Sequence, residues 1–177
     1  MYQFQLDFWN EFKKIFCYKT GLRKFVESHA KPWRKYDRLT DISVDELKDI
    51  ICSENIKVLL LDMDGTVKHY KKGLISENKE WVDSLKESVK IYLMSNANKS
   101  LTSKVADELK VDYIHSAKKP LLKSYQYVAQ MENCNPSEMI AIGDAILFDI
   151  KGAERFGIDK TILLKDLNIL GLKSEYH

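Results

Sequence analysis

Short apolar runs alternate with amphipathic stretches over most of this chain, and this alternation limits its fold more than any other feature. The apolar runs are rich in Val, Ile, Leu and Tyr, and they cover Lys57–Leu61, Val89–Met94, Val111–Ile114, Met139–Ile142 and Thr161–Leu164. Runs this short and this apolar are typical of strands that are covered on both faces. Helical patterns lie between them, over Glu77–Glu87, Ser100–Leu109, Leu121–Met131 and Phe148–Phe156. The alternation predicts an α/β fold with a Rossmann-like parallel sheet flanked by helices.

The first apolar run leads directly into two acidic residues, Asp62 and Asp64. This position is informative because ligands of parallel sheets bind beyond the carboxyl ends of the strands. Carboxylates two residues apart in an extended segment point the same way, and such a pair suits Mg²⁺. One carboxylate can also attack phosphorus while its neighbour serves as acid and base. Gly65 permits a tight turn here. The alternative is a surface loop that carries two acids.

Small and basic residues follow the next two predicted strands. Ser95 and Asn96 come directly after the second strand, where a hydroxyl and backbone N–H groups at a helix start can hold phosphate. The alternative is that one of them caps the next helix. Lys119 follows the third strand, and a lysine fixed there can offset negative charge on phosphate and nucleophile. Pro120 suits the first turn of a helix, with Lys119 at its cap. The alternative is that Lys118 and Lys119 are both solvated.

A second acidic pair, Asp144 and Asp149, follows the fourth predicted strand. Ile146, Leu147 and Phe148 lie between the two acids, and apolar residues are unusual in a solvated loop. Asp144 would complete a metal site. Asp149 would either bind the metal directly or hold a metal-binding residue in place through a hydrogen bond. The alternative for Asp144 is a plain helix cap. An acid pair, a hydroxyl, a lysine and a second acid pair at four successive strand ends favour one shared site.

This order of motifs resembles that of the haloacid dehalogenase superfamily of phosphatases, over about residues 55–165. The superfamily carries Asp-x-Asp-x-Thr, then Ser or Thr, then Lys, then Gly-Asp with a further Asp. The resemblance implies that Asp62 is the nucleophile, and that Asp64 is the acid/base and offers its backbone carbonyl to Mg²⁺. It implies catalytic roles for Asp62, Asp64 and Lys119, substrate binding by Thr66, Ser95, Asn96 and Lys119, and metal binding by Asp62, Asp64, Asp144 and Asp149.

The intervals between these motifs leave no room for a cap domain. Only 28 residues separate Thr66 from Ser95, and 23 separate Ser95 from Lys119, so one helix and one strand fill each interval. The chain therefore resembles the capless class, subfamily III, whose members act on large substrates or recruit a partner as the lid. The Lys119-Pro120 element, the spacing from Asp144 to Asp149 and Gly152–Gly157 resemble the YqeG-type branch, which includes phosphatidylglycerophosphate phosphatases.

We therefore expect a Mg²⁺-dependent phosphomonoester hydrolase that forms an aspartyl-phosphate on Asp62. The resemblance makes phosphatidylglycerophosphate the best substrate guess. The alternatives are a phosphatase for soluble sugar or nucleotide phosphates, and a non-catalytic phosphate-binding scaffold. The stretch Asp41–Leu47 also resembles the short lead-in helix of the YqeG-type branch, with Ser43 or Asp41 as its cap.

Charge and cysteine content narrow the partners and the compartment. The net charge is only +2, so we expect no nucleic-acid partner. Three scattered cysteines, Cys17, Cys52 and Cys134, form no Cys-x-x-Cys pair, which argues against a zinc site and for a reducing compartment. No apolar run is long enough to span a bilayer, and the N-terminus resembles neither a secretory signal nor a transit peptide. We expect a cytoplasmic protein.

The first 40 residues differ from the rest in composition, with nine Lys/Arg against four Asp/Glu and ten aromatic residues. Phenylalanine recurs every four residues, as one apolar stripe of a helix, at Phe4, Phe8, Phe12 and Phe16. We expect residues 1–40 to form a helical extension and residues 41–177 the phosphatase domain. The stripe within residues 1–20 suits peripheral contact with a membrane surface. The alternative is packing on the phosphatase core or on a second subunit of an oligomer.

Overall fold

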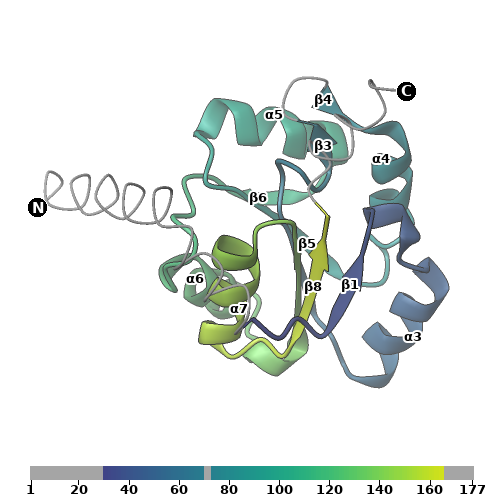
Figure 1. The fold of residues 1–177 in the computed structure, drawn as a ribbon, viewed down its shortest axis with the longest axis vertical. Helices are drawn as coiled ribbons and strands as arrows, with labels where there is room; N and C mark the ends of the chain where they lie inside the picture. Colours follow the sequence, from purple (N-terminus) through teal and green to yellow (C-terminus); the bar gives the residue numbers. More distant parts are fainter. Residues whose placement is uncertain (1–29, 70–72, 166–177) are drawn as a thin grey trace, which may run out of the picture. The chain divides into compact units, whose positions relative to one another are not determined.

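Six parallel strands form one sheet in the order β1-β8-β7-β2-β5-β6 (Figure 1). The computed structural model describes residues 30–69 and 73–165, so the aromatic stripe within residues 1–20 lies outside the described residues. The strands are β1 (Arg34–Tyr36), β2 (Val58–Leu61), β5 (Lys90–Met94), β6 (Asp112–Ile114), β7 (Met139–Gly143) and β8 (Lys160–Leu164). The predicted parallel α/β sheet is confirmed.

Helices separate the strands, as the sequence predicts. They are α3 (Val44–Ser53), α4 (Ser76–Asp83), α5 (Lys99–Leu109), α6 (Lys123–Met131) and α7 (Lys151–Phe156), with single turns η1 (Leu39–Asp41), η2 (Pro136–Glu138) and the π-turn η3 (Ile146–Ile150). A two-stranded hairpin, β3 (Lys68–His69) and β4 (Gly73–Leu74), follows the acid pair. In the described part of the chain, no helix has the length and apolarity that crossing a membrane requires.

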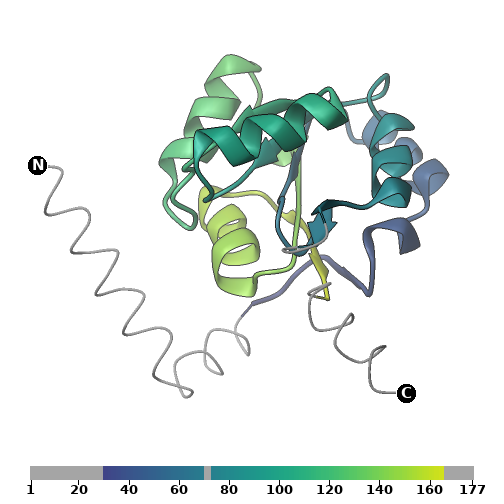
Figure 2. The same cartoon turned by 90° about the horizontal axis from the view of Figure 1, so that it is seen from above.

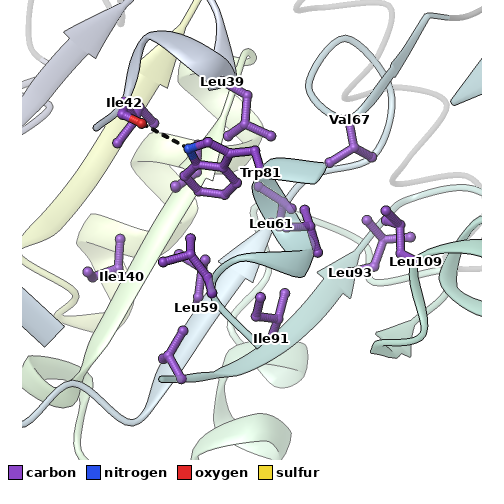
Figure 3. Close-up of a cluster of buried hydrophobic side chains, with 14 of the residues drawn as sticks. Leu39, Ile42, Leu59, Leu61, Val67, Trp81, Ile91, Leu93, Leu109 and Ile140 are labelled. Atoms are coloured by element: carbon purple, nitrogen blue, oxygen red, sulfur yellow. Dashed lines mark hydrogen bonds between the residues drawn. The ribbon is translucent and has the colours of Figure 1, made fainter. Parts of the chain in front are cut away.

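The sheet divides the core into two layers because alternate strand residues face opposite sides. Leu59 and Leu61 of β2 pack with buried residues of α3, α4 and α5, whereas Val58 and Leu60 pack with those of α6 and α7. Figure 2 shows α3 and α4 on one side of the sheet and α6 and α7 on the other. Trp81 of α4 anchors the first layer, where its indole Nε1 donates a hydrogen bond to the Ile42 carbonyl at 2.9 Å (Figure 3).

The sheet domain begins earlier than the expected boundary at residue 40. β1 pairs with β8, and Leu39 is fully buried in the first core layer. The compact unit that holds the sheet begins at Pro32, and part of the stretch that we assigned to the extension contributes an edge strand. The lead-in helix is present as α3, and the Ser43 hydroxyl accepts a hydrogen bond from Glu46 N at 3.3 Å.

The strand order places a switch point between β2 and β7. From β2 the chain continues outward through β5 and β6, and it then returns to form β7 and β8 on the other side of β2. Crevices at such points are where α/β sheets bind their ligands. Asp62 N donates to the Ile142 carbonyl at 2.9 Å, which fixes the end of β2 beside the end of β7. The topology therefore brings the first and last motifs together.

Candidate active site

Three carboxylates converge at this switch point. Asp62 follows β2, Asp144 follows β7, and Asp149 belongs to the π-turn η3. Each offers a carboxylate oxygen, and these oxygens lie within 4.8 Å of one another. A cluster made only of carboxylate oxygens suits a hard divalent cation such as Mg²⁺. Asp144 does not act as a helix cap, because η3 begins after Ala145 with no side-chain cap.

Lys119 joins two of these carboxylates. Its Nζ lies 2.5 Å from Oδ1 of Asp62 and 2.5 Å from Oδ1 of Asp149, and its side chain is only 4% exposed. The second oxygen of Asp149 accepts a hydrogen bond from Ala145 N at 2.9 Å. Burial alone would lower the pKa of Lys119, but the two carboxylates outweigh it and hold the pKa above its usual value. The lysine is therefore a fixed positive charge.

The backbone of Lys119 is held by a side chain from the neighbouring strand end. Lys119 N donates to Asn96 Oδ1 at 2.7 Å, and Asn96 Nδ2 donates to the Lys119 carbonyl at 3.2 Å. The Lys119–Pro120 peptide is cis, within a turn closed by Leu121 N and the Lys118 carbonyl at 2.9 Å. The expected helix start at Pro120 is therefore wrong, because this turn delays α6 to Lys123. Lys118 is exposed, as its position beside Lys119 suggests.

Asp62 has an unusual affinity for its proton. Burial and the nearby charge of Asp149 raise its pKa to about 7, although Lys119 acts in the opposite direction. A carboxylate that attacks phosphorus, as the family resemblance implies for Asp62, must be ionised. Additional positive charge near Asp62 would favour its ionised form. This electrostatic demand agrees with a cation site among the three carboxylates.

The carboxylate of Asp64 does not join this cluster. It forms an ion pair with Lys68 of the hairpin, four residues later. Gly65 between them has a φ of +85°, and a Cβ at this position would collide with the carboxylate of Asp144. The turn after Asp62 thus packs directly against Asp144, and any side chain at position 65 would have to displace that carboxylate.

The two hydroxyl residues of the motifs are both buried. Ser95 Oγ accepts a hydrogen bond from Ala97 N at 3.0 Å. Asn98 caps α5 by accepting from Leu101 N, so neither Ser95 nor Asn96 is the helix cap. Within the described ranges, Thr66 Oγ1 has no hydrogen-bond partner.

Two residues of this region were not predicted from the sequence. Asn78 of α4 is buried, and its Nδ2 donates to the carbonyls of Thr66 and Val67 at 3.0 and 3.3 Å, which ties the motif loop to the helix. Lys68 is the second. A polar residue on an amphipathic helix and a lysine in a loop are both usually solvated. The sequence around Asn78 and Lys68 therefore did not indicate that either is buried beside the motif loop.

Comparison with known proteins finds sequence similarity to a hydrolase family and to one phosphatase. Residues 72–157 match a family model described as haloacid dehalogenase-like hydrolase. The probable phosphatase YqeG of Bacillus subtilis (strain 168) is 25% identical over 118 residues, which is 66% of this chain and 66% of that protein.

Two solved structures share the fold. A hypothetical protein from Xanthomonas campestris has a TM-score of 0.51 and 13% identity, over 73% of this chain and 72% of that one. An uncharacterized protein from Listeria monocytogenes serotype 4b has a TM-score of 0.51 and 16% identity, over 67% and 99%. At these identities the structures establish the fold alone. The chain is thus similar to haloacid dehalogenase-like hydrolases over residues 72–157, and to a probable phosphatase over two thirds of its length.

Proposed function

We propose that this protein is a Mg²⁺-dependent phosphomonoester phosphatase that acts through a phosphorylated Asp62. The observation that carries this proposal is the buried contact of Lys119 with both Asp62 and Asp149, beside the carboxylate of Asp144. The name of the relative, a probable phosphatase, supports the same reaction.

The acidic cluster fits a magnesium ion in donor chemistry. Asp62 and Asp144 would hold the ion, with Asp149 beside them and already engaged with Lys119. When bound, the ion would favour ionised Asp62 and would draw negative charge from the phosphoryl oxygens. Asp64 would contribute its backbone carbonyl, and its carboxylate, which pairs with Lys68, lies outside the cluster.

The chain's own groups can complete a two-step transfer. In the first step a carboxylate oxygen of Asp62 bonds to phosphorus, the bond to the leaving oxygen breaks, and the carboxyl group of Asp64, in its protonated form, gives that oxygen its proton. In the second step a water attacks phosphorus, its proton passes to Asp64, and the bond between Asp62 and phosphorus breaks. Lys119 stays charged throughout and offsets the negative charge that develops on the phosphoryl group.

For the substrate we propose phosphatidylglycerophosphate or a closely related lipid phosphate. Apolar residues near the motifs support an apolar substrate. Leu121 is 38% exposed two residues after Lys119, and Ile146, Leu147 and Phe148 are only half-buried directly after Asp144. A lipid glycerophosphate could contact these side chains while its phosphate reaches Asp62.

The test compares hydrolysis of p-nitrophenyl phosphate with and without Mg²⁺, and then of phosphatidylglycerophosphate in vesicles against sugar and nucleotide phosphates. We expect Mg²⁺-dependent release of phosphate and the highest kcat/KM for the lipid. No hydrolysis of any ester would favour a phosphate-binding scaffold. A preference for soluble esters would retain the phosphatase and reject the lipid.

A further inference from the structure

Lys68 is a buried cation for which the reaction above has no role. Its side chain is 7% exposed and its ammonium is paired with the carboxylate of Asp64. The ammonium also donates to the His69 carbonyl at 3.5 Å. Burying an ammonium group costs free energy, so such a residue needs compensating partners. One of its partners is Asp64, the residue that we assign as acid/base.

The backbone fixes this pair beside the carboxylate cluster. Lys68 N donates to the Met63 carbonyl at 3.1 Å, and Gly65 N donates to the Lys68 carbonyl at 3.0 Å, so residues 63–68 form a closed turn. The same turn packs against Asp144 at Gly65. The ammonium group of Lys68 therefore belongs to the turn that borders the site, while its four-carbon stem allows the group to move.

The pair also creates a conflict for catalysis. While Asp64 holds the ammonium of Lys68, the lysine competes with the leaving-group oxygen for the same carboxylate. A phosphate monoester brings a more concentrated negative charge than a carboxylate does, and lysine is a common phosphate ligand. An incoming phosphoryl group would therefore attract the ammonium away from Asp64.

We propose that Lys68 is a second phosphate-binding cation, held on Asp64 in the free protein and transferred to a phosphoryl oxygen when substrate binds. The transfer moves an ion-pair partner and breaks no covalent bond. It couples substrate binding to release of the Asp64 carboxylate. This inference rests on the proposed phosphatase function and adds a substrate-binding residue to it.

Lys160 provides a matched control. It is 8% exposed, and its ammonium pairs with Glu54 at 2.6 Å. It lies at the start of β8, whereas the site lies at the carboxyl ends of the strands. Each lysine is itself buried and loses an ion pair when its ammonium is removed, but only Lys68 lies beside the proposed phosphate site. A purely structural role for Lys68 predicts similar results for the two lysines.

The experiment measures binding of inorganic phosphate by calorimetry in the presence of Mg²⁺. We expect Lys68→Met to weaken binding about tenfold or more, since a hydrogen bond to a charged group contributes about 1.5–3 kcal/mol. Lys68→Arg should restore most of the affinity, and Lys160→Met should bind like the wild type. With p-nitrophenyl phosphate, Lys68→Met should raise KM as well as lower kcat.

A second measurement uses the wild-type chain, so it does not depend on the folding of Lys68→Met. The NMR signal of the Lys68 Cε methylene, assigned from its loss in Lys68→Arg, should shift when phosphate and Mg²⁺ are added, and that of Lys160 should not. An unmoved Lys68 signal, or Lys68→Met binding phosphate as Lys160→Met does, would overturn the inference. If the wild type neither binds nor hydrolyses phosphate esters, the proposed function itself fails.

Discussion

The ammonium group of Lys119 lies 2.5 Å from Oδ1 of Asp62, a contact between residues 57 positions apart in the chain. The lysine is in turn fixed by Asp149 through its side chain and by Asn96 through its backbone. A nucleophile held by a charged, immobile partner loses little freedom when it reacts, because its orientation is set before substrate arrives. The relationship between these two residues is therefore the basis of the first two predictions.

Asp62→Asn should abolish turnover of p-nitrophenyl phosphate. An amide is a poor nucleophile and a weaker magnesium ligand, so both proposed roles of Asp62 fail together. Activity should fall below about one hundredth of the wild type, which corresponds to a loss of about 3 kcal/mol or more in transition-state stabilisation. Residual activity above that level, in protein purified free of host phosphatases, would contradict the covalent route.

Lys119→Ala and Lys118→Ala should differ sharply. Removing Lys119 leaves Asp62 and Asp149 facing each other without a cation, so we expect activity to fall at least about 100-fold. Lys118 is exposed, and its replacement should change activity by less than about threefold. Steady-state kinetics of the two variants, with circular dichroism to verify folding, show which of the two lysines the reaction requires. The reverse result would mean that the lysine motif is assigned one residue too late.

The sequence predicted the sheet and its site-bearing edge because both depend on strong, local patterns. Continuous apolar runs marked β2, β5 and β7, and parallel strands necessarily bring their carboxyl ends to one edge. The polar residues directly after those runs were therefore expected to lie close together. β1 was missed because its three residues, Arg34–Tyr36, are not an apolar run and join the sheet only by pairing with β8.

The contacts that organise the site had no such pattern. Asn96 is engaged with the backbone of Lys119 across 23 residues, and Asn78 supports the motif loop from α4. A hydrogen bond between distant segments depends on the packed fold, so a single sequence does not reveal it. The pairing of Lys68 with Asp64 is local, but an isolated lysine in a loop is more often solvated.

The elevated pKa of Asp62 predicts that metal-free protein loses stability as pH rises from about 4 to about 7. The folded chain retains the Asp62 proton up to about pH 7, whereas an unfolded chain releases it near pH 4. The folded state thus binds more protons in this window, and its free energy of unfolding falls with increasing pH. We expect this contribution to reach a few kcal/mol.

Urea denaturation in EDTA at pH 5 and pH 7.5 measures this effect. Because other groups also titrate, the informative quantity is the difference between wild type and Asp62→Asn, which lacks the ionisable group. The wild type should lose more stability than the variant over this interval, and Mg²⁺ should recover stability mainly in the wild type. Equal losses in the two proteins would show that the environment of Asp62 does not disfavour its charge.

Gly65→Ala and Gly73→Ala form a matched pair that separates backbone strain from damage to the metal site. Both glycines have a φ between +80° and +90°, of +85° for Gly65 and +83° for Gly73, so alanine strains the backbone similarly at each position. A Cβ at Gly65 would collide with the carboxylate of Asp144, whereas a Cβ at Gly73 meets no atom of residues 30–69 or 73–165 within 4 Å. We therefore expect both variants to lose about 1 kcal/mol or slightly more in stability from strain.

Only Gly65→Ala should also weaken Mg²⁺ binding, by at least about tenfold, because the added methyl group must displace Asp144 from the position it shares with Asp62. Titration of Mg²⁺ into each metal-free variant by calorimetry, with Mg²⁺-dependent activity as a second readout, tests this difference. If both variants bind Mg²⁺ like the wild type, the close approach of Gly65 to Asp144 has no bearing on the metal. If both variants lose Mg²⁺ affinity equally, the loss comes from backbone strain at the positive φ and not from the contact with Asp144.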